Sequence, residues 1–492
     1  MIKQISHSII YELKHVRFYI YLLFTLLYCL ISLVNHYNYH TFAYDLGIYN
    51  NSIYQYGHLI NNPHPYGHAS VTNFLADHFS LYTVIVSPLH YIFGTYTLLY
   101  IQIASILFGG AGIYKLVKNW HPTTFLPEIA LFHFFSFYGI FSALSFDYHD
   151  NVVGTMFVPW FLYFMQCNKL KYAAIVALLI VISKENMALW LFCICLGLLF
   201  IYKKDKLKRN FALITGICAI LYAVIIITIV MPTMVKPGAS ASHFQYSILG
   251  NNLAELFETL IYKTKYITRA LFCNVTTDRS VDGVKEETYA CLLLSGGLFL
   301  LIRFEYAIML LSIILQKVLS DDVGRWGITS QYSIEFAPIV VIALYASFNY
   351  FKNIKLKITI ALIFCVLSFT TTLCVMFYRK SPWYSEIQCN IFKKSHYTSE
   401  YNKLDIDKIS ALIPKNAKLS TNNHLGSHLA FRTHIYLFPD VNDANYILVA
   451  DVLYEFPMWG EELHNEIMKY KNSPNWQTIT EINGIYLFKK IK

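Results

Sequence analysis

Residues 203–210, KKDKLKRN, and the following residues 211–231, FALITGICAILYAVIIITIVM, decide the class of fold. An apolar stretch of roughly 20 residues is long enough to cross the hydrocarbon of a bilayer as a helix. A lysine-rich run at one end of such a stretch is typical of its cytoplasmic flank. The two segments therefore predict a membrane-spanning helix that begins on the cytoplasmic side.

The composition of the whole chain extends this prediction. Of its 492 residues, 56% are hydrophobic and 14% are charged, whereas charged residues make up about a quarter of a soluble domain. Spanning segments must be helical because the bilayer interior offers no water to the backbone. We expect an α-helical polytopic membrane protein with about eleven spans, near residues 17–36, 96–117, 124–142, 151–167, 171–184, 186–202, 211–231, 288–302, 304–319, 333–350 and 357–378.

Positive charge in the short connections predicts the orientation. The net charge of +9 could suggest nucleic-acid binding, but the basic residues gather in alternate connections, as the positive-inside rule requires. Besides residues 203–209, these are Lys115, Lys118, Lys169, Lys171, Arg303, Lys352, Lys355 and Lys357. We therefore expect a protein of the cytoplasmic (inner) membrane with a cytoplasmic N-terminus. The first span follows Lys3, Lys14 and Arg17 without a cleavage site, so it is expected to be a retained anchor.

The sequence suggests two domains. Residues 1–378 are expected to form the membrane domain, with outer loops at 37–95 and 232–287. Within the first loop, Pro88 makes residues 79–93 a poor span, so we expect an interfacial or re-entrant helix there. Residues 379–492 are expected to form a small extracytoplasmic α/β domain. It would contain strands near 444–449 and 478–488, a hairpin turn at Asn483-Gly484 and a helix over 461–470.

The ten cysteines do not show the spacing of a metal site. Eight lie in or beside apolar runs, which is typical of small core residues. Only Cys273 and Cys389 fall in segments expected outside the membrane. A single disulfide between them is therefore an option.

Acidic and histidine residues gather where apolar runs end on the expected outer face. Asp45 follows the first span and could act as a general base or hold a cation. It could equally cap a helix that begins at Leu46. A second cluster joins Asp147 and His149 between two spans, where they could bind a divalent metal, polarise a hydroxyl group or contact phosphate, or form a solvated capping loop.

Three further positions carry charge near span ends. Asp77 and His78 repeat the acid and histidine pairing but make no constellation by themselves. Lys184 and Glu185 end a short apolar run, where ionisable groups are costly unless they are paired or face a cavity. Lys184 could contact a lipid phosphate, or the pair could mark the membrane boundary by snorkelling. Arg325 could also bind phosphate, or pair with Asp321 or Asp322.

Several of these motifs occur together in a known family. The chain contains FAYDLGIYN at 42–50, DHFS at 77–80, SFDYH at 145–149 and SKEN at 183–186. In this order they resemble the predicted membrane proteins called domain of unknown function 2079. That family is similar to the GT-C class of integral membrane glycosyltransferases, which use polyprenyl-phosphate sugars and carry an essential acid in the first outer loop. The resemblance implies a GT-C-like fold with an outer cavity, and Asp45 is the position that matches the acid.

The residues and the resemblance together predict a glycosyltransferase that moves a sugar from a polyprenyl-phosphate donor to an envelope, lipid or protein acceptor on the outer face. Asp45 would be catalytic, and the substrate-binding residues would be Asp77, His78, Asp147, His149, Lys184, Glu185 and Arg325. If a divalent metal ion takes part, Asp45, Asp147 and His149 would hold it. Two rival functions are a transporter or flippase, and a non-catalytic scaffold for envelope assembly. No nucleic-acid partner is expected.

Overall fold

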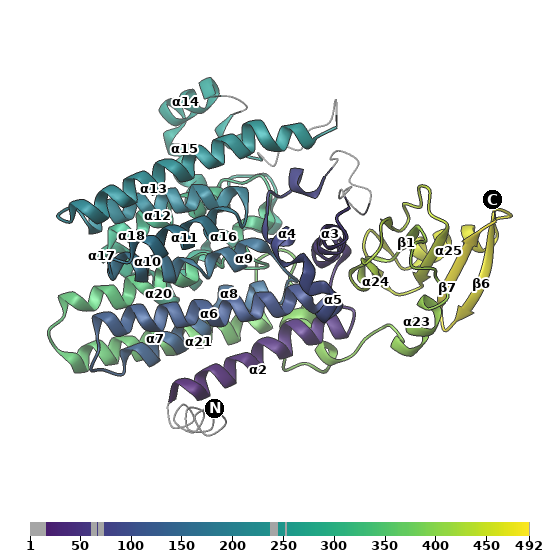
Figure 1. Ribbon diagram of the computed structural model, residues 1–492, viewed down its shortest axis with the longest axis horizontal. Coiled ribbons are helices and arrows are strands. Elements are labelled where there is room, and N and C mark those ends of the chain that lie inside the picture. The colour runs from purple at the N-terminus through teal and green to yellow at the C-terminus, as the bar shows by residue number, and fades with distance from the viewer. Residues whose placement is uncertain (1–15, 61–65, 67–72, 237–244, 251–252, 492) are drawn as a thin grey trace.

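The computed structural model describes residues 16–60, 66, 73–236, 245–250 and 253–491. Lys3 and Lys14, which precede the first expected span, lie outside this part of the chain. Figure 1 shows a large helical body, with a smaller domain that carries the labelled strands beside one of its ends. The described chain is therefore mainly helical and has a small C-terminal sheet domain, as the sequence predicts.

Four helical segments of the described chain are long and apolar enough to cross a membrane. They are α2 (Val16–Tyr37), the series Tyr82–Trp120, α13 (Lys206–Ile225) with its continuation to Met234, and α21 (Ile354–Phe377). A fifth is counted if α7 (Leu126–Phe135) and α8 (Tyr138–Leu144), which meet at a bend of 40°, form one broken span. The protein is thus a membrane protein with apolar helices, and the expected number of eleven spans is not confirmed.

Breaks in the backbone shorten the other apolar stretches. Gly296, with a φ of 102°, separates α16 (Val284–Leu292) from α17 (Phe299–Ile302) inside the expected span 288–302. The helix α11 (Leu170–Val181) has 12 residues, and at 1.5 Å per residue it reaches about 18 Å, against about 30 Å of hydrocarbon. The other short helices in expected spans are α10 (Val158–Gln166), α12 (Glu185–Ile201), α18 (Phe304–Met309), α19 (Leu311–Val318) and α20 (Phe336–Ser347).

The segment expected to be an interfacial or re-entrant helix is a series of short turns. It comprises α4 (Tyr82–Val86), η3 (Ser87–Leu89), α5 (His90–Phe93) and η4 (Gly94–Tyr96). Pro88 lies in the first turn of η3, a position where proline's missing N–H is tolerated. The series leads directly into the long helix α6 (Thr97–Trp120).

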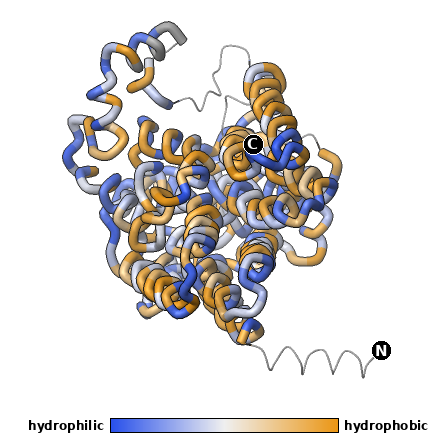
Figure 2. The backbone as a smooth tube through the Cα atoms, turned by 90° about the vertical axis from the view of Figure 1, so that its left-hand side faces the viewer, coloured by the Kyte–Doolittle hydropathy of each residue, from blue (hydrophilic) through white to orange (hydrophobic). Residues whose placement is uncertain are grey.

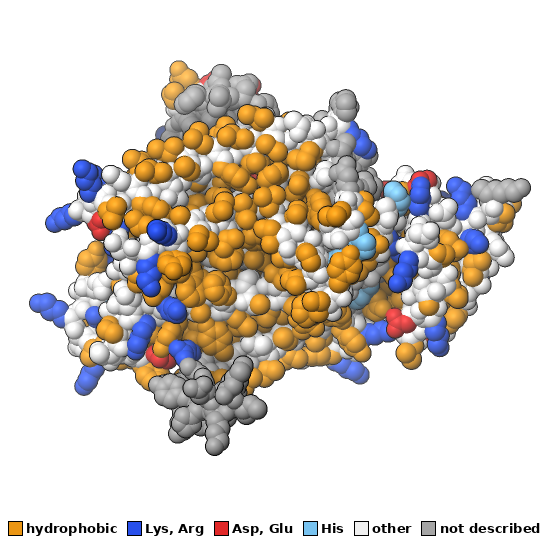
Figure 3. Space-filling model, viewed as in Figure 1, with side chains coloured by type: hydrophobic (Ala, Val, Ile, Leu, Met, Phe, Trp, Pro, Cys, Tyr) orange, Lys and Arg blue, Asp and Glu red, His pale blue; other side chains and the backbone are white. Residues whose placement is uncertain are grey.

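Burial divides the helices between the centre and the surface of the body. Every residue of α20 is buried, so this helix lies at the centre. By contrast α13 exposes Ile214, Ile217 and Leu221. Contact of these apolar side chains with water is unfavourable, whereas contact with lipid is not. Figure 2 shows that hydrophobic residues are frequent along the helices of the body, and Figure 3 shows apolar side chains over much of its surface.

The C-terminal domain is built on a five-stranded sheet with the order β2-β1-β3-β7-β6. The strands β1 (Leu419–Thr421), β2 (Ile435–Leu437) and β3 (Tyr446–Ala450) are parallel, whereas β6 (Trp476–Ile482) and β7 (Ile485–Lys490) form an antiparallel hairpin. Asn483 and Gly484 at its turn both have positive φ, which fits the predicted hairpin. Two strands, β4 (Tyr454–Glu455) and β5 (Met458–Trp459), form a separate ladder. The helices are α23 (Lys403–Ser410), α24 (Asn423–Leu429) and α25 (Glu461–Lys471).

All ten cysteines are free thiols, so the structure does not contain the optional disulfide. The Cys389 thiol lies at the end of α22 (Glu386–Cys389) and contacts the Ser145 hydroxyl at 3.4 Å. This segment packs beside α2, because the Asn35 side chain donates a hydrogen bond to the Gln388 carbonyl at 3.0 Å. The chain that leads into the C-terminal domain is therefore anchored on the first helix.

Candidate functional site

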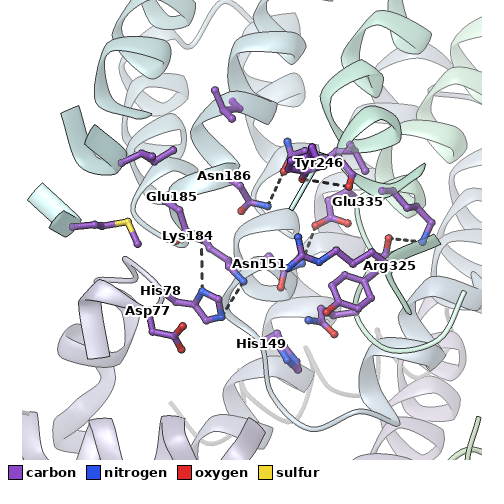
Figure 4. Close-up of a pocket in the computed structure, with 18 of the residues that line it drawn as sticks. Asp77, His78, His149, Asn151, Lys184, Glu185, Asn186, Tyr246, Arg325 and Glu335 are labelled. Atoms are coloured by element: carbon purple, nitrogen blue, oxygen red, sulfur yellow. Dashed lines mark hydrogen bonds and ion pairs between the residues drawn. The ribbon is translucent and has the colours of Figure 1, made fainter. Parts of the chain in front are cut away.

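A cavity of about 1240 Å³ is lined in part by α3 (Ile48–Gly57), which lies at the end of the helical body nearest the C-terminal domain in Figure 1. Seven of the eight site residues predicted from the sequence line it, namely Asp45, Asp77, His78, His149, Lys184, Glu185 and Arg325. They come from five segments of the chain that are far apart in the sequence. Figure 4 shows most of them pointing toward a common space. The helix ends thus bring these residues together in one site.

Asp45 lies in the middle of η1 (Ala43–Gly47), a single π-helical turn that leads into α3 (Ile48–Gly57). The Asp45 side chain is about a quarter exposed, at 24%, and faces the cavity. Neither η1 nor α3 has a side-chain hydrogen bond at its N-cap. The alternative in which Asp45 caps the following helix is therefore wrong.

Asp147 is the one predicted site residue that does not line the cavity. Its Oδ2 accepts hydrogen bonds from the backbone N–H groups of Phe42, at 2.7 Å, and Leu46, at 3.2 Å. These bonds bracket the turn that carries Asp45. Burial and the nearby Asp45 carboxylate raise the pKa of Asp147 well above its usual value, and the two amide bonds oppose this rise. Asp147 thus holds the turn that carries Asp45, and its expected contact with a substrate stays a prediction.

His149 joins this turn to the loop between α8 and α9 (Asp150–Thr155). Its Nε2 lies 3.4 Å from Asp45 Oδ1, and its backbone N–H donates to the Gln102 side chain at 3.0 Å. The Phe146 ring stacks on the imidazole at 5.5 Å. Burial lowers the pKa of His149, so the neutral ring predominates at neutral pH. An aspartate oriented by a neutral imidazole is a suitable general base.

Lys184, His78 and Glu185 form a second chain of contacts on the cavity wall. Lys184 Nζ lies 3.5 Å from His78 Nε2, and His78 Nδ1 lies 3.8 Å from Glu185 Oε1. Glu185 also accepts a hydrogen bond from the Phe79 N–H at 3.0 Å, which fixes the loop that carries Asp77 and His78. The lysine therefore belongs to a polar cluster, not to a boundary pair that only snorkels to the membrane surface.

Arg325 reaches the cavity from η10 (Val323–Trp326). Its guanidinium lies 3.3 Å from the Asp322 carboxylate, so the salt bridge considered from the sequence is present. Asp321 makes other contacts, because it accepts hydrogen bonds from the backbone and hydroxyl group of Ser247. Since Arg325 remains part of the cavity wall, the salt bridge and a contact with an anion are compatible.

Sequence reasoning missed a group of amide and acidic residues on the cavity wall. Asn151 donates a hydrogen bond to Glu335 Oε1 at 2.8 Å, and both side chains are buried. A carboxyl group inside the expected span 333–350 was a signal that could have been used, since such groups are rare in membrane segments. The further polar residues of the wall are Asn186, Lys236, Tyr246, Gln316, Lys317, Gln331 and Tyr332.

Many of the lining side chains are apolar. They come from the end of α13 and the turn that follows it, from α15 (Thr264–Phe272) and from α19. The side chains are those of Ile227, Met231, Val235, Ile267, Leu271, Ile313, Leu315 and Leu319. The cavity lining therefore contains charged side chains and apolar side chains of the kind that contact a hydrocarbon chain.

The C-terminal domain makes hydrogen bonds to the turn that carries Asp45. Asn423 Oδ1 accepts a hydrogen bond from the Ala43 N–H at 2.8 Å, and the hydroxyl groups of Ser427 and Thr41 lie 2.8 Å apart. The Asn50 side chain donates to the Ser427 carbonyl at 3.1 Å. Helix α24 thus packs directly on η1 and α3, so the geometry of the candidate site depends on both parts of the protein.

The described residues contain no group of three or more His, Cys, Asp and Glu side chains arranged to hold a metal ion. The trio considered from the sequence is not assembled, because Asp147 Oδ2 is turned to backbone amides. Of the trio, only Asp45 and His149 are in contact with each other through their side chains among the contacts of the described residues.

Two comparisons with known proteins bear on identity. A search of curated proteins finds no match to the chain. The family described as predicted membrane protein (DUF2079) matches residues 35–487, a range that includes Asp45 and the other predicted site residues. Because the match covers most of the sequence, the protein belongs to this family of predicted membrane proteins, DUF2079.

Proposed function

We propose that the protein is a membrane glycosyltransferase of the GT-C type, which moves a sugar from a polyprenyl-phosphate donor to an acceptor of the cell envelope. The observation that carries the proposal is the cavity itself, which joins an aspartate–histidine pair, several cationic side chains that include Lys184 and Arg325, and an apolar wall. A lipid-linked sugar phosphate has three matching parts, namely a hydroxyl-rich ring, an anion and a hydrocarbon chain.

The residues divide the reaction between them. Asp45, oriented by His149, takes the proton from the acceptor hydroxyl group as its oxygen forms a bond to the anomeric carbon of the sugar. The bond between that carbon and the phosphate oxygen breaks, and the phosphate leaves with the electron pair. Lys184 and Arg325 stabilise the charge that develops on this leaving group. The apolar wall holds the polyprenyl chain beside them.

The proposal includes the expected orientation and domains. The basic connections belong to the cytoplasm, whereas the cavity and the C-terminal domain, residues 379–492, lie outside. Figure 3 supports this, because Lys and Arg side chains gather at the end of the helical body opposite the C-terminal domain, with apolar surface between.

Replacement of Asp45 by Asn tests the catalytic role. Turnover should fall by about a hundredfold, the usual scale for the loss of a positioned base. The variant should remain folded, because the turn is held by Asp147 and Asn423 and not by the Asp45 carboxylate. Turnover is measured as release of undecaprenyl phosphate from undecaprenyl-phosphate sugars, with purified protein in nanodiscs made from membrane lipids.

Asp407→Asn is a suitable control, since Asp407 is an exposed aspartate of α23 away from the cavity. It should retain the turnover of the unchanged protein. Full turnover in Asp45→Asn would contradict the assignment of the base. Failure of the unchanged protein to bind or use any polyprenyl-phosphate sugar would contradict the proposed function itself and favour the transporter or the scaffold.

A further inference from the structure

Tyr49 belongs to the cavity wall beside the pair of Asp45 and His149. It follows Asp45 by four residues, at the second position of α3, and lines the cavity. The residue is only 4% exposed. Its ring meets the rings of Phe74, Tyr148 and His149 edge-on, with centroids 5.2, 5.2 and 6.0 Å apart. Because edge-on packing is a favoured geometry for aromatic pairs, these contacts fix the direction of the side chain.

The hydroxyl group of Tyr49 has no partner and remains accessible. It makes no hydrogen bond to a residue that the structure describes. Other tyrosine hydroxyl groups without a partner, such as those of Tyr138 and Tyr345, are sealed inside the helical body, whereas that of Tyr49 is not. Polar groups on the wall of a ligand cavity orient the ligand through hydrogen bonds. An accessible hydroxyl group at this position is therefore a contact for a bound molecule.

This hydroxyl group keeps its proton. Burial raises the pKa of Tyr49 well above its usual value. The negative charges that add to the rise belong to Asp150, Asp77, Glu185 and Asp45, in decreasing order of effect. At neutral pH the group is therefore an uncharged donor. An ionised carboxylate can only accept hydrogen bonds, so Tyr49 supplies a donor that its acidic neighbours lack.

Tyr49 reaches from one chain of contacts in the site to the other. Its ring touches His149, and the carboxylate of Glu185, which belongs to the Lys184 cluster, acts on its hydroxyl group. Figure 4 shows His149 apart from Lys184 and Glu185. In the proposed reaction the acceptor hydroxyl group lies at Asp45 and the phosphate lies at Lys184. The sugar that moves from one to the other therefore lies between them, in the space that Tyr49 borders.

We propose that Tyr49 is a substrate-binding residue, and that its hydroxyl group donates a hydrogen bond to an oxygen of the sugar that the reaction transfers. The inference rests on the proposed function and adds a contact for the sugar itself. It also has a consequence for the product. Once the sugar has left, the polyprenyl phosphate lacks this contact, so it binds more weakly than the donor from which it was formed.

Tyr49→Phe tests the contact by removing a single oxygen atom. The three ring contacts remain and no hydrogen bond to a described residue is lost, so the thermal unfolding temperature should not fall. Affinity is measured in nanodiscs for undecaprenyl phosphate and for undecaprenyl-phosphate glucose, galactose and mannose. For the sugar lipid that the unchanged protein binds most tightly, Tyr49→Phe should weaken binding about tenfold, the scale of one hydrogen bond. It should leave the affinity for undecaprenyl phosphate unchanged.

Tyr345→Phe is the matched control. It removes the same atom from a fully buried tyrosine of α20, whose hydroxyl group also lacks a partner among the described residues but which does not line the cavity. It should leave the affinities for all four lipids unchanged. A second variant restores the donor. Incorporation of para-aminophenylalanine in place of Tyr49 presents an N–H group at the same position, and it should recover most of the affinity for the sugar lipid.

An equal loss of affinity for undecaprenyl phosphate and the sugar lipid would place the contact at the phosphate and overturn the proposal. Unchanged affinity for the sugar lipid in Tyr49→Phe, or the same loss in Tyr345→Phe, would overturn it and leave the proposed function in place. A lower unfolding temperature in Tyr49→Phe, without recovery by para-aminophenylalanine, would assign the hydroxyl group a structural role instead. If the unchanged protein binds none of the four lipids, the proposed function fails, and the inference fails with it.

Discussion

Two aspartates that lie close together in the site have different surroundings. Asp45 is partly exposed to the cavity and contacts His149, whereas Asp147 is buried and accepts two backbone hydrogen bonds. A general base must reach the substrate, and a residue that satisfies buried amides fixes a loop. Both residues are aspartates near the ends of apolar runs, so only their burial and hydrogen bonds distinguish the two expected roles.

Substitution of Asp147 should therefore have a different signature from substitution of Asp45. Asn at position 147 still presents an oxygen to the Phe42 and Leu46 amides, so Asp147→Asn should keep turnover within about tenfold. Asp147→Leu leaves both amides without an acceptor and should destabilise the protein by about 2 kcal/mol or more. Turnover and thermal unfolding in nanodiscs check this prediction. A hundredfold loss in a fully stable Asp147→Asn would instead indicate direct participation in the reaction.

At the scale of elements, the sequence predicted local features better than helix lengths. Asn483-Gly484 and the periodicity of residues 461–470 depend on neighbouring residues, and both appear as predicted. The strands β1 and β2 have three residues each and are stabilised by long-range pairing, so no local sequence pattern predicts them. Hydropathy also did not reveal the break at Gly296, because a positive φ interrupts a helix without changing its apolar character.

The candidate site was predictable in part for the same reason. Charged residues at the ends of apolar runs were visible, and helix ends on one side of a membrane lie near each other. Asn151 and Gln331 are uncharged, so no signal in the sequence indicated them. Their place on the cavity wall results from how α9 and the chain before α20 pack. Nor could the sequence show that α24 contacts η1, since these elements are separated by more than 370 residues.

The contact between α24 and η1 leads to a prediction for Asn423. Its side-chain oxygen accepts the Ala43 N–H, and Asp supplies an equivalent oxygen, whereas Leu does not. Asn423→Leu should speed hydrogen exchange of residues 43–47 and lower turnover, with donor affinity unchanged. Asn423→Asp should restore both. Exchange at α13, remote from this contact, is the internal control, and faster exchange there as well would indicate general unfolding.

A histidine on α24 makes the same junction sensitive to acid. The His428 ring stacks on His36 at 3.9 Å, and burial lowers the pKa of His428 to about 3 from 6.5. As the pH falls below about 6.5, the unfolded form takes up a proton that the folded form resists until about pH 3. Stability is therefore lost with falling pH across that window, by about 1 kcal/mol between pH 7.5 and 5.5 for this residue.

His428→Phe keeps a stacked ring without a titrating group. Its thermal unfolding temperature should fall less than that of the unchanged protein between pH 7.5 and 5.5. The remaining slope belongs to neighbours such as His40, whose pKa burial lowers to about 4. Identical pH slopes in the two proteins would show that His428 does not contribute.

At the scale of the whole molecule, the basic run at the start of α13 and the cavity lie at opposite ends of the apolar body. The run Lys203–Arg209 includes the first turn of α13, and the cavity lies beyond the other end of that helix, where Ile227 and Met231 form part of its wall. The distance between the ends of a spanning helix is set by the bilayer, so the proposed orientation places the basic flank and the cavity on opposite sides of the membrane.

This arrangement predicts which side of the membrane each end occupies. A cysteine at Lys415, which is exposed in the C-terminal domain, should react with an impermeant thiol reagent in intact cells. One at Lys206, an exposed residue of the basic run, should react only after the membrane is opened. Ser420 would be a poor position, because its side chain is buried in β1. The test uses a background in which the exposed Cys218 and Cys374 are replaced by serine. Reaction at Lys206 but not at Lys415 in intact cells would place the cavity in the cytoplasm and contradict an outer-face transferase, even if Asp45 proved to be catalytic.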